Sequence, residues 1–487
     1  MTITSWFFNQ CKLDDNNNNH SKPNIGEKIK QQLSSENHNS NNTKPQQQEQ
    51  PKNTFNIDYQ PIYKANPNDP GVLFFKEYRS LEPNVKDYIS NKYQLKFVQI
   101  ITRHGRRTPE SKNYPLSMWT CNSTDNLITN KDKDRPDCNM GQLTVWGVKD
   151  MVNVGNSYKH LFIDSLGFLD KVYNPNQIFV RSSNRERTIS SARSFMHGLY
   201  GGSFSDEQEK EAPHHSSFFI LPDKQENMYP RSNDRYIFLK GLVKKHKDVI
   251  KENKESGLAE FTAQIKDIFE KSKGFDSPFY VPAWRSYNGL VNSFDCFKNH
   301  DLPLPKGFTK EIIDRMYLES AKEFKAVKIY PELSILGIGR FVNDLEKQME
   351  LKAKNDPSVD QLKLSLYSAH DTTLAALLVA FDMYEELRHP VTSSALEFIL
   401  FEKKQETSSA PPKTPEQEKQ LIENQFVKVV YNHSVIHIGA CKEKEVDDMC
   451  PLSEFIEISK KLIPSNYEEM GKITEEEKQK YIYEATH

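Results

Sequence analysis

A histidine lies between arginines at residues 103–109, RHGRRTP, directly after an apolar run. Imidazole is a competent nucleophile towards phosphorus, and each guanidinium presents a planar fork that can hold two phosphate oxygens. These residue types indicate phosphate chemistry in which His104 attacks and the arginines neutralise charge. The alternative is that a short basic cluster marks a solvated loop, a nuclear address or a nucleic-acid patch.

Two further segments end an apolar run in polar side chains. In residues 367–374, YSAHDTTL, His370 and Asp371 follow a predicted strand and precede a predicted helix. Taken alone, Asp371 is equally well explained as a helix N-cap. Residues 177–183, QIFVRSS, end a short strand near Arg181. Because ligands of open α/β sheets bind outside the carboxyl ends of the strands, we expect the three strand ends to converge on one site.

These segments resemble those of the histidine acid phosphatase family, the large branch of the histidine phosphatase superfamily. The resemblance spans roughly residues 92–465. The His-Asp pair is typical of acid phosphatases and many phytases, and segment 138–144 looks like that of the 2-phosphoxylose phosphatase and acid-phosphatase-like group. The matching stretches are RHGRRTP at 103–109, VRSSNRERTISSA at 180–192 and YSAHDTTL at 367–374, with weaker similarity at 140–147 and 450–455.

The resemblance implies a phosphomonoester hydrolase. In such an enzyme His104 would form a phosphohistidine, and Asp371 would protonate the leaving alkoxide and then activate a water molecule. A carboxylic acid that starts protonated predicts an acidic pH optimum. No metal or other cofactor is implied, because arginines supply the positive charge. The residues expected around the phosphoryl group are Arg103, Arg107, Arg181 and His370.

Three other arginines receive no role. Arg106 stands at the variable position of the signature, and we interpret it as a loop arginine that faces water. Arg185 and Arg187 fall on the helix predicted after Arg181, where surface charges or a weak ion pair are expected.

Two other functions stay open from the sequence. One is a catalytically lapsed relative that keeps the arginines as a phosphate-binding or scaffold module, and the other is a phosphomutase that uses the same covalent histidine. The net charge of −2, from 65 basic and 67 acidic residues, argues against a nucleic-acid or anionic-membrane surface. The expected partner is a small-molecule or sugar phosphomonoester. No apolar run is long enough to cross a bilayer, and nothing indicates the oligomeric state.

The overall pattern predicts an α/β fold, with a mostly parallel central sheet flanked by helices and an inserted, mainly helical cap domain. The cap is expected to control access to the site and the choice of leaving group, and the alternative is a passive elaboration of the fold. The predicted units are a disordered Asn/Gln/Ser-rich tail at 1–55, an extended lead-in at 56–92, a catalytic core at 93–204 and 332–465, a cap at 205–331, and a charged, frayed tail at 466–487.

Local periodicity adds some individual elements. The apolar spacing through residues 239–250 predicts one amphipathic helix, and residues 258–269 predict another. Strands are expected at 95–102, 395–401 and 426–431, and residues 402–424, rich in Pro, Lys, Glu and Gln, are expected to form a loop.

Six cysteines are few for 487 residues, but their placement is informative. Cys441 and Cys450 flank a short polar loop, and the resemblance implies a disulfide between them. Cys121 and Cys138 could close another loop. Such pairs favour an oxidising compartment.

The compartment stays open between two alternatives. Possible glycosylation sites at Asn122 and Asn432 agree with a secretory or lysosomal location, as does the family resemblance. Residues 1–8 lack the basic start and the sustained apolar run of a cleavable signal, which favours the cytoplasm.

Overall fold

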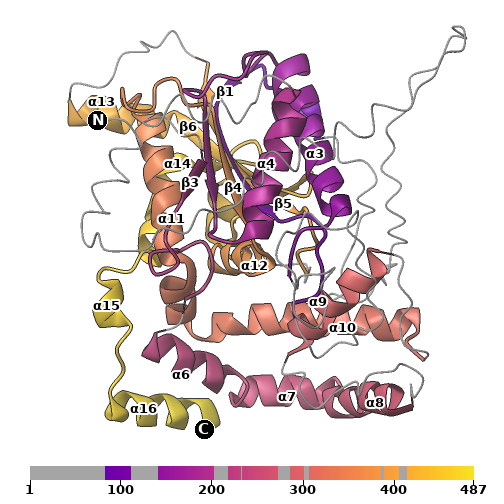
Figure 1. The fold of residues 1–487 in the computed structure, drawn as a ribbon. Helices are drawn as coiled ribbons and strands as arrows, with labels where there is room; N and C mark the ends of the chain where they lie inside the picture. The colour runs from indigo at the N-terminus through magenta and orange to yellow at the C-terminus, as the bar shows by residue number, and fades with distance from the viewer. Residues whose placement is uncertain are drawn as a thin grey trace, which may run out of the picture.

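The computed structural model describes residues 83–110, 141–201, 218–231, 233–271, 286–300, 307–384, 389–404 and 414–487. The predictions for the tail at 1–55, for most of the lead-in, for the Cys121 and Cys138 pair and for Asn122 lie outside these residues. Within them, a β-sheet forms the middle layer, and helices cover both of its faces (Figure 1).

The sheet has the order β3-β2-β4-β1-β5-β6-β7, and β8 pairs with β6. β1 to β4 run parallel to their neighbours within that group, whereas β5 to β8 pair antiparallel. The predicted α/β class is confirmed, with β1 parallel to β4 on one side and antiparallel to β5 on the other. The strands are β1 Tyr93–Arg103, β2 Ile178–Ser182, β3 Phe218–Ile220, β4 Leu364–Ala369, β5 Ala395–Lys403, β6 Gln425–Tyr431, β7 Ser434–Ile436 and β8 Cys450–Pro451.

Strand register brings the predicted site segments to one edge of the sheet. Arg103 lies opposite Ala369 in the β1–β4 pair, and the last residues of β2 also pair with β4. The backbone N–H of His104 then donates to the carbonyl of Ala369 at 3.1 Å, and that of Ser183 donates to Ser368 at 3.1 Å. The residues that follow all three strands are therefore neighbours, although they are far apart in the chain.

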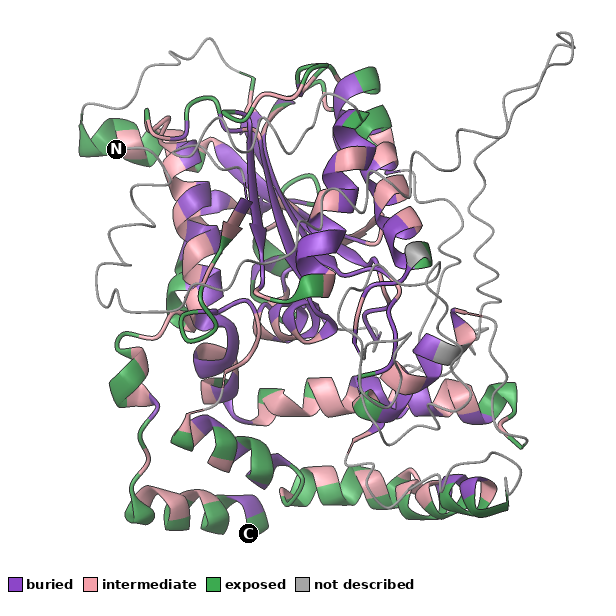
Figure 2. Cartoon of the chain, viewed as in Figure 1, coloured by how far each residue is buried: buried purple, intermediate pink, exposed green. Residues whose placement is uncertain are grey.

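Two apolar clusters hold the helices to the sheet. One face packs against α3 Val145–Lys159 and α4 Glu186–Tyr200. The other face packs against α11 Pro331–Ala353, α12 Asp371–Ala380 and α14 Leu452–Leu462. Figure 2 shows that the strands between these layers are buried, which is why their sequences are apolar on both faces.

A group of helices lies together beyond the end of the sheet where α12 begins (Figure 1). The single helix predicted through residues 239–250 is wrong. The chain forms two helices there, and the Nδ1 of His246 accepts the backbone N–H of Asp248 as the N-cap of the second. The helix predicted at 258–269 is confirmed. The helices of this group are α6 Asp234–Val243, α7 Lys247–Glu255, α8 Leu258–Lys271, α9 Tyr287–Lys298 and α10 Lys310–Lys325.

The C-terminal part is more ordered than predicted. Part of the expected 402–424 loop is helix α13 Pro415–Glu423. The predicted frayed tail at 466–487 forms α15 Tyr467–Met470 and α16 Glu475–Thr486. Here Glu477 pairs with Arg235 of α6 at 2.5 Å, and the hydroxyl of Tyr481 donates to Glu332 at 2.6 Å. Polar contacts with α6 and α11, together with Ala485, Tyr467, Met470 and Tyr481 packed into an apolar cluster with these helices, hold this segment in place.

Three smaller predictions can be compared with the structure. The Cys441–Cys450 disulfide is present. The side-chain oxygen of Asn432 accepts the backbone N–H of Ala395 at 3.0 Å, so this sequon asparagine is engaged within the fold. Among the described residues, no helix has both the length and the apolar character needed to cross a membrane.

Candidate active site

His104 follows β1 and is buried at the carboxyl edge of the sheet. Its Nδ1 lies 2.8 Å from the carbonyl oxygen of Gly105. Because a carbonyl only accepts, Nδ1 carries the hydrogen and Nε2 keeps its lone pair. Burial, followed by the charges of Arg187, Arg103 and Arg107, lowers the pKa of His104 well below its usual value. The imidazole is therefore neutral and nucleophilic even in acid.

Gly105 allows the signature loop to approach α3 closely. A Cβ atom on this residue would lie 2.4 Å from the backbone oxygen of Gly147, in the first turn of α3. Any side chain at Gly105 would therefore push the loop, and His104 with it, away from the helix.

Asp371 is the first residue of α12, and it lies beside Arg103. Arg103 Nη2 is 3.4 Å from Asp371 Oδ2, and Arg103 Nη1 donates to the carbonyl of Pro390 at 2.6 Å. Burial would raise the pKa of Asp371, but Arg103 and then His389 and Asn292 outweigh it and hold this pKa below its usual value. The carboxyl group is thus ionised in the unliganded site.

Asn292, on α9, connects the helices beyond the sheet to this pair. Its Nδ2 donates to Asp371 Oδ2 at 2.9 Å, and its Oδ1 accepts from Arg103 Nη2. Asn292 was not among the predicted residues, because it lies in no recognised motif and far from both partners in the chain.

His370 lies next to His104, with ring centroids 5.8 Å apart. Its Nδ1 is 3.4 Å from Arg187 Nη2, and its Nε2 is 2.8 Å from the hydroxyl oxygen of Ser183. Because a guanidinium only donates, Nδ1 accepts and Nε2 carries the hydrogen. Burial and the charge of Arg187 lower the pKa of His370 well below its usual value, so this ring is neutral as well.

Arg107 and Arg187 complete the positive side of the site. Arg107 is buried and donates to the carbonyl of Thr108 at 2.9 Å. Arg187 contacts His370 and is the largest charged contributor to the lowered pKa of His104. Burial, opposed by Glu110, lowers the pKa of Arg187 to about 10, so its guanidinium is charged at acidic and neutral pH.

Arg181 does not join this cluster. It is fully buried, and its Nη1 donates to Asp344 at 2.8 Å while its Nη2 lies 3.2 Å from Glu226. Its guanidinium also packs near the rings of Phe219 and Phe341. The position therefore gives no support to the phosphate contact predicted for Arg181, because a residue inside the strand points into a neighbouring layer instead of beyond the strand end.

Arg187 stands where Arg181 was expected. It is the second residue of α4, the helix that follows β2. Asp371 likewise begins the helix that follows β4, so the start of a helix after a parallel strand was the signal that could have identified Arg187.

The interpretation of Arg106 as facing water is wrong. Its Nε and Nη2 donate to the two carboxylate oxygens of Asp150, each at 2.6 Å, and its Nη1 donates to the carbonyl of Asn299 at 2.9 Å. Arg106 thus anchors the signature loop to α3. Arg185 is exposed and lies 3.5 Å from Asp223, as expected for a surface charge.

The site thus combines a neutral imidazole, three guanidinium groups and a carboxyl group. In the described part of the chain, no group of three or more His, Cys, Asp and Glu side chains is arranged to hold a metal ion.

Residues 94–432 match the family described as the histidine phosphatase superfamily (branch 2). The chain belongs to this branch. Two probable acid phosphatases of Dictyostelium discoideum are similar to this branch-2 histidine phosphatase. One is 67% identical over 426 residues, which cover 87% of this chain and 89% of the relative. The other is 62% identical over 409 residues, covering 84% and 88%.

More distant relatives agree with this assignment. Human lysosomal acid phosphatase is 25% identical to this branch-2 histidine phosphatase over 386 residues, which cover 77% of this chain and 79% of the relative. A solved structure of Hafnia alvei phytase in complex with myo-inositol hexakis sulphate has a TM-score of 0.54 at 14% identity, covers 79% of this chain and 100% of its own, and shows a shared fold alone. The predicted family is confirmed, and with it the prediction of a phosphoric monoester hydrolase.

Proposed function

We propose that this branch-2 histidine phosphatase hydrolyses phosphomonoesters through a phosphohistidine on Nε2 of His104. The observation that carries the proposal is the buried, neutral His104 ring, whose Nδ1 is engaged by the carbonyl of Gly105 and whose pKa is lowered by burial and by the charges of Arg187, Arg103 and Arg107. Charge in the transition state of phosphoryl transfer is spread over the equatorial oxygens, and preorganised cations stabilise it there. We assign this task to Arg103, Arg107 and Arg187.

In the first step the Nε2 lone pair forms a bond to phosphorus while the bond from phosphorus to the alkoxide oxygen breaks. Asp371 delivers its proton to that oxygen, so an alcohol leaves. In the second step Asp371 takes a proton from water, the water oxygen attacks the phosphohistidine, and phosphate is released with His104 regenerated. Asp371 therefore gives up one proton in the first step and regains one in the second, so the enzyme returns to its starting protonation state.

Asp371 must be protonated for the first step, although Arg103 favours its ionised form in the empty site. A bound phosphate dianion offsets the charge of the arginines and thereby raises the pKa of Asp371. A substrate monoanion can also bring the proton with it. Either route favours acidic pH.

The test compares wild-type protein with His104→Ala on a chromogenic phosphomonoester. We expect a loss of at least about a thousandfold in kcat/KM. His160→Ala is the matched control, because His160 is exposed on the far end of α3 and should leave the rate unchanged. Equal rates for the wild-type protein and His104→Ala would exclude His104 as the nucleophile.

Rapid acid-free quenching should also trap a phosphoenzyme that is stable in base and labile in acid, as a phosphoramidate is.

The reaction products distinguish the proposed hydrolase from the two other candidate functions. A phosphomutase would return an isomerised sugar phosphate, and a catalytically lapsed relative would bind phosphate without turnover.

A further inference from the structure

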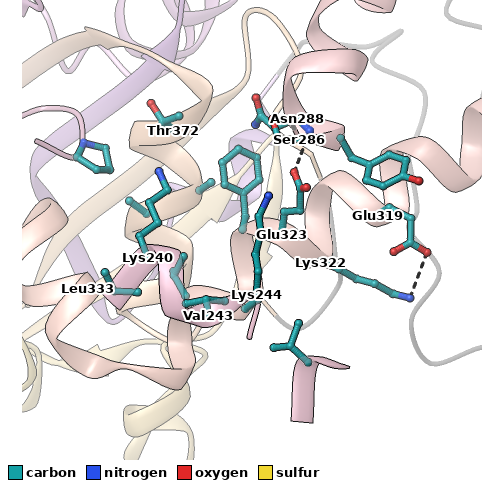
Figure 3. Close-up of a pocket in the computed structure, with 18 of the residues that line it drawn as sticks. Lys240, Val243, Lys244, Ser286, Asn288, Glu319, Lys322, Glu323, Leu333 and Thr372 are labelled. Carbon is teal, nitrogen blue, oxygen red and sulfur yellow. Dashed lines mark hydrogen bonds and ion pairs between the residues drawn. The ribbon is translucent and has the colours of Figure 1, made fainter. Parts of the chain in front are cut away.

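A cavity of about 520 Å³ lies between α12 and the helices beyond the sheet (Figure 3). We call it the α12 cavity. One wall is formed by Thr372, Ala375 and Ala376, which recur at helical spacing on one face of α12. The opposite walls come mainly from α6, α7 and α10, and the lining is largely apolar. This volume matches that of pockets that bind small organic molecules.

The α12 cavity adjoins the proposed proton donor. Thr372, in its wall, directly follows Asp371. Asn288, also in its wall, accepts at Oδ1 a hydrogen bond of 2.8 Å from Asn292 Nδ2, which also donates to Asp371 Oδ2 at 2.9 Å. The wall is therefore two hydrogen bonds away from the carboxyl group that protonates the leaving oxygen. Since a general acid must contact that oxygen, the proposed role of Asp371 would direct the alcohol part of the substrate towards α12 and α9.

Charged side chains of both signs interrupt the apolar walls of the cavity. They are Lys240, Lys244 and Lys322, and Glu252, Glu319 and Glu323. Lys240 and Lys244 extend towards the interior of the cavity from neighbouring turns of one segment (Figure 3). Burial, followed by the charge of Lys244, lowers the pKa of Lys240. An anion bound beside Lys240 would raise this pKa again. The charge of Glu323 acts on both lysines, but Lys240 forms no ion pair with any described residue, so Lys240 is the cation offered to a ligand.

We infer, on the basis of the proposed function, that the α12 cavity receives the alcohol part of the substrate, and that this substrate is an amphipathic phosphomonoester. Its aliphatic or aromatic body lies against Ala376 and the apolar residues opposite. A second anionic group at the far end of that body reaches Lys240. A short or purely polar alcohol leaves the apolar walls uncovered and gains nothing from them.

The first test measures binding without turnover. Linear alkylphosphonates from methyl to octyl cannot be hydrolysed, and their dissociation constants with the wild-type protein can be measured by calorimetry. We expect the affinity to rise about two- to fourfold per methylene until the cavity is filled. A flat series overturns the inference. Because no hydrolysis is involved, this result is independent of the His104→Ala assay, so failure of the inference and failure of the proposed function are distinguishable.

Two filling variants locate the effect. Ala376→Phe and Val249→Phe narrow the α12 cavity from opposite walls, and each should abolish most of the gain between methylphosphonate and octylphosphonate. Two positions are used because one of them alone could disturb folding, which thermal unfolding reports. If correctly folded filling variants keep the full gain, the alkyl chain binds elsewhere and the inference falls.

The distal anion is tested with 8-phosphonooctanoate against octylphosphonate. Lys240→Gln should weaken binding of the carboxylated probe by about tenfold and leave octylphosphonate unchanged. Lys245→Gln is the matched control, since Lys245 is exposed and does not line the cavity. Equal effects of Lys240→Gln and Lys245→Gln on the carboxylated probe would remove Lys240 from the inference.

Discussion

Glu110 Oε1 lies 2.5 Å from Arg187 Nη2, and Glu110 Oε2 lies 3.6 Å from Arg107 Nη2. A carboxylate of the protein thus binds two of the guanidinium groups that are proposed to bind phosphate. Burial would raise the pKa of Glu110, but Arg107 and Arg187 outweigh it and lower this pKa, so the side chain is negatively charged. The Glu110 side chain is also half exposed, which leaves it room to move aside.

We therefore expect Glu110→Gln to strengthen inhibition by inorganic phosphate by about tenfold, because the phosphate no longer displaces a competing anion. The measurement is the inhibition constant of phosphate in the chromogenic assay. Glu186→Gln is the control, because Glu186 is exposed next to Arg187 in sequence. Unchanged or weaker inhibition in Glu110→Gln would show that the carboxylate helps to hold the arginines rather than to compete.

Substitutions of Arg187 and Arg181 should have different effects, the first on catalysis and the second on stability. Arg187→Gln should lower kcat/KM by at least about a hundredfold with little change in the free energy of unfolding. Arg181→Gln leaves Asp344 and Glu226 without their buried cation, so we expect a loss of about 3–5 kcal/mol of stability. Steady-state kinetics and urea unfolding of both variants provide the comparison. The reverse pattern would return the phosphate-binding role to Arg181.

Asp371→Asn should lower kcat/KM most for substrates whose leaving group most needs a proton. For an alkyl phosphate, whose alkoxide is a strong base, we expect kcat/KM to fall by about a thousandfold. For p-nitrophenyl phosphate, whose phenolate leaves without help, the loss should be about tenfold or less. Measuring both substrates with both proteins tests this, and equal losses would mean that Asp371 acts by charge or position instead of as an acid.

The pH dependence of kcat/KM should depend on the arginines around His104. In the wild-type protein, burial and these cations lower the pKa of His104, so activity should persist well below pH 6.5, where a free imidazole is protonated. Removing one cation makes the imidazolium form easier to reach. Arg187→Gln is therefore expected to move the acid limb of the profile to higher pH. Coincident acid limbs would mean that another group sets this limb.

Glu397 should make the fold more stable in acid. It is fully buried on β5, where Tyr88 and Tyr158 donate to it at 2.5 and 2.7 Å. Burial raises its pKa from 4.5 to about 7, although both hydrogen bonds oppose the rise. The native state therefore holds this proton more tightly than the unfolded chain. The stabilisation is fully present below about pH 4.5 and is lost as the pH rises through about 7.

Glu397→Gln should accordingly flatten the stability profile. Between about pH 4.5 and 7.5, the wild-type protein should lose about 3 kcal/mol of unfolding free energy relative to Glu397→Gln. Urea unfolding at several pH values measures this difference. Parallel profiles for the two proteins would show that the carboxyl group ionises in place without cost.

The meeting of the three strand ends was predictable, because its signals are local. His104, His370 and Asp371 each follow a run that can only be a buried strand, and parallel strands bring their carboxyl ends to one edge. The disulfide was implied by the family resemblance. The helix break at His246 was missed, because apolar spacing continues across it.

By itself, the sequence determined the α/β class and the convergence of the segments that carry His104, His370 and Asp371, since strand patterns and short motifs depend only on neighbouring residues. Only the tertiary structure decided that Arg187 rather than Arg181 contacts His370 beside His104, that Asn292 bridges Arg103 and Asp371, and that Glu110 lies between two guanidinium groups. The physical reason is that the direction of a long polar side chain depends on which distant charges and cavities surround it, and packing alone brings those together.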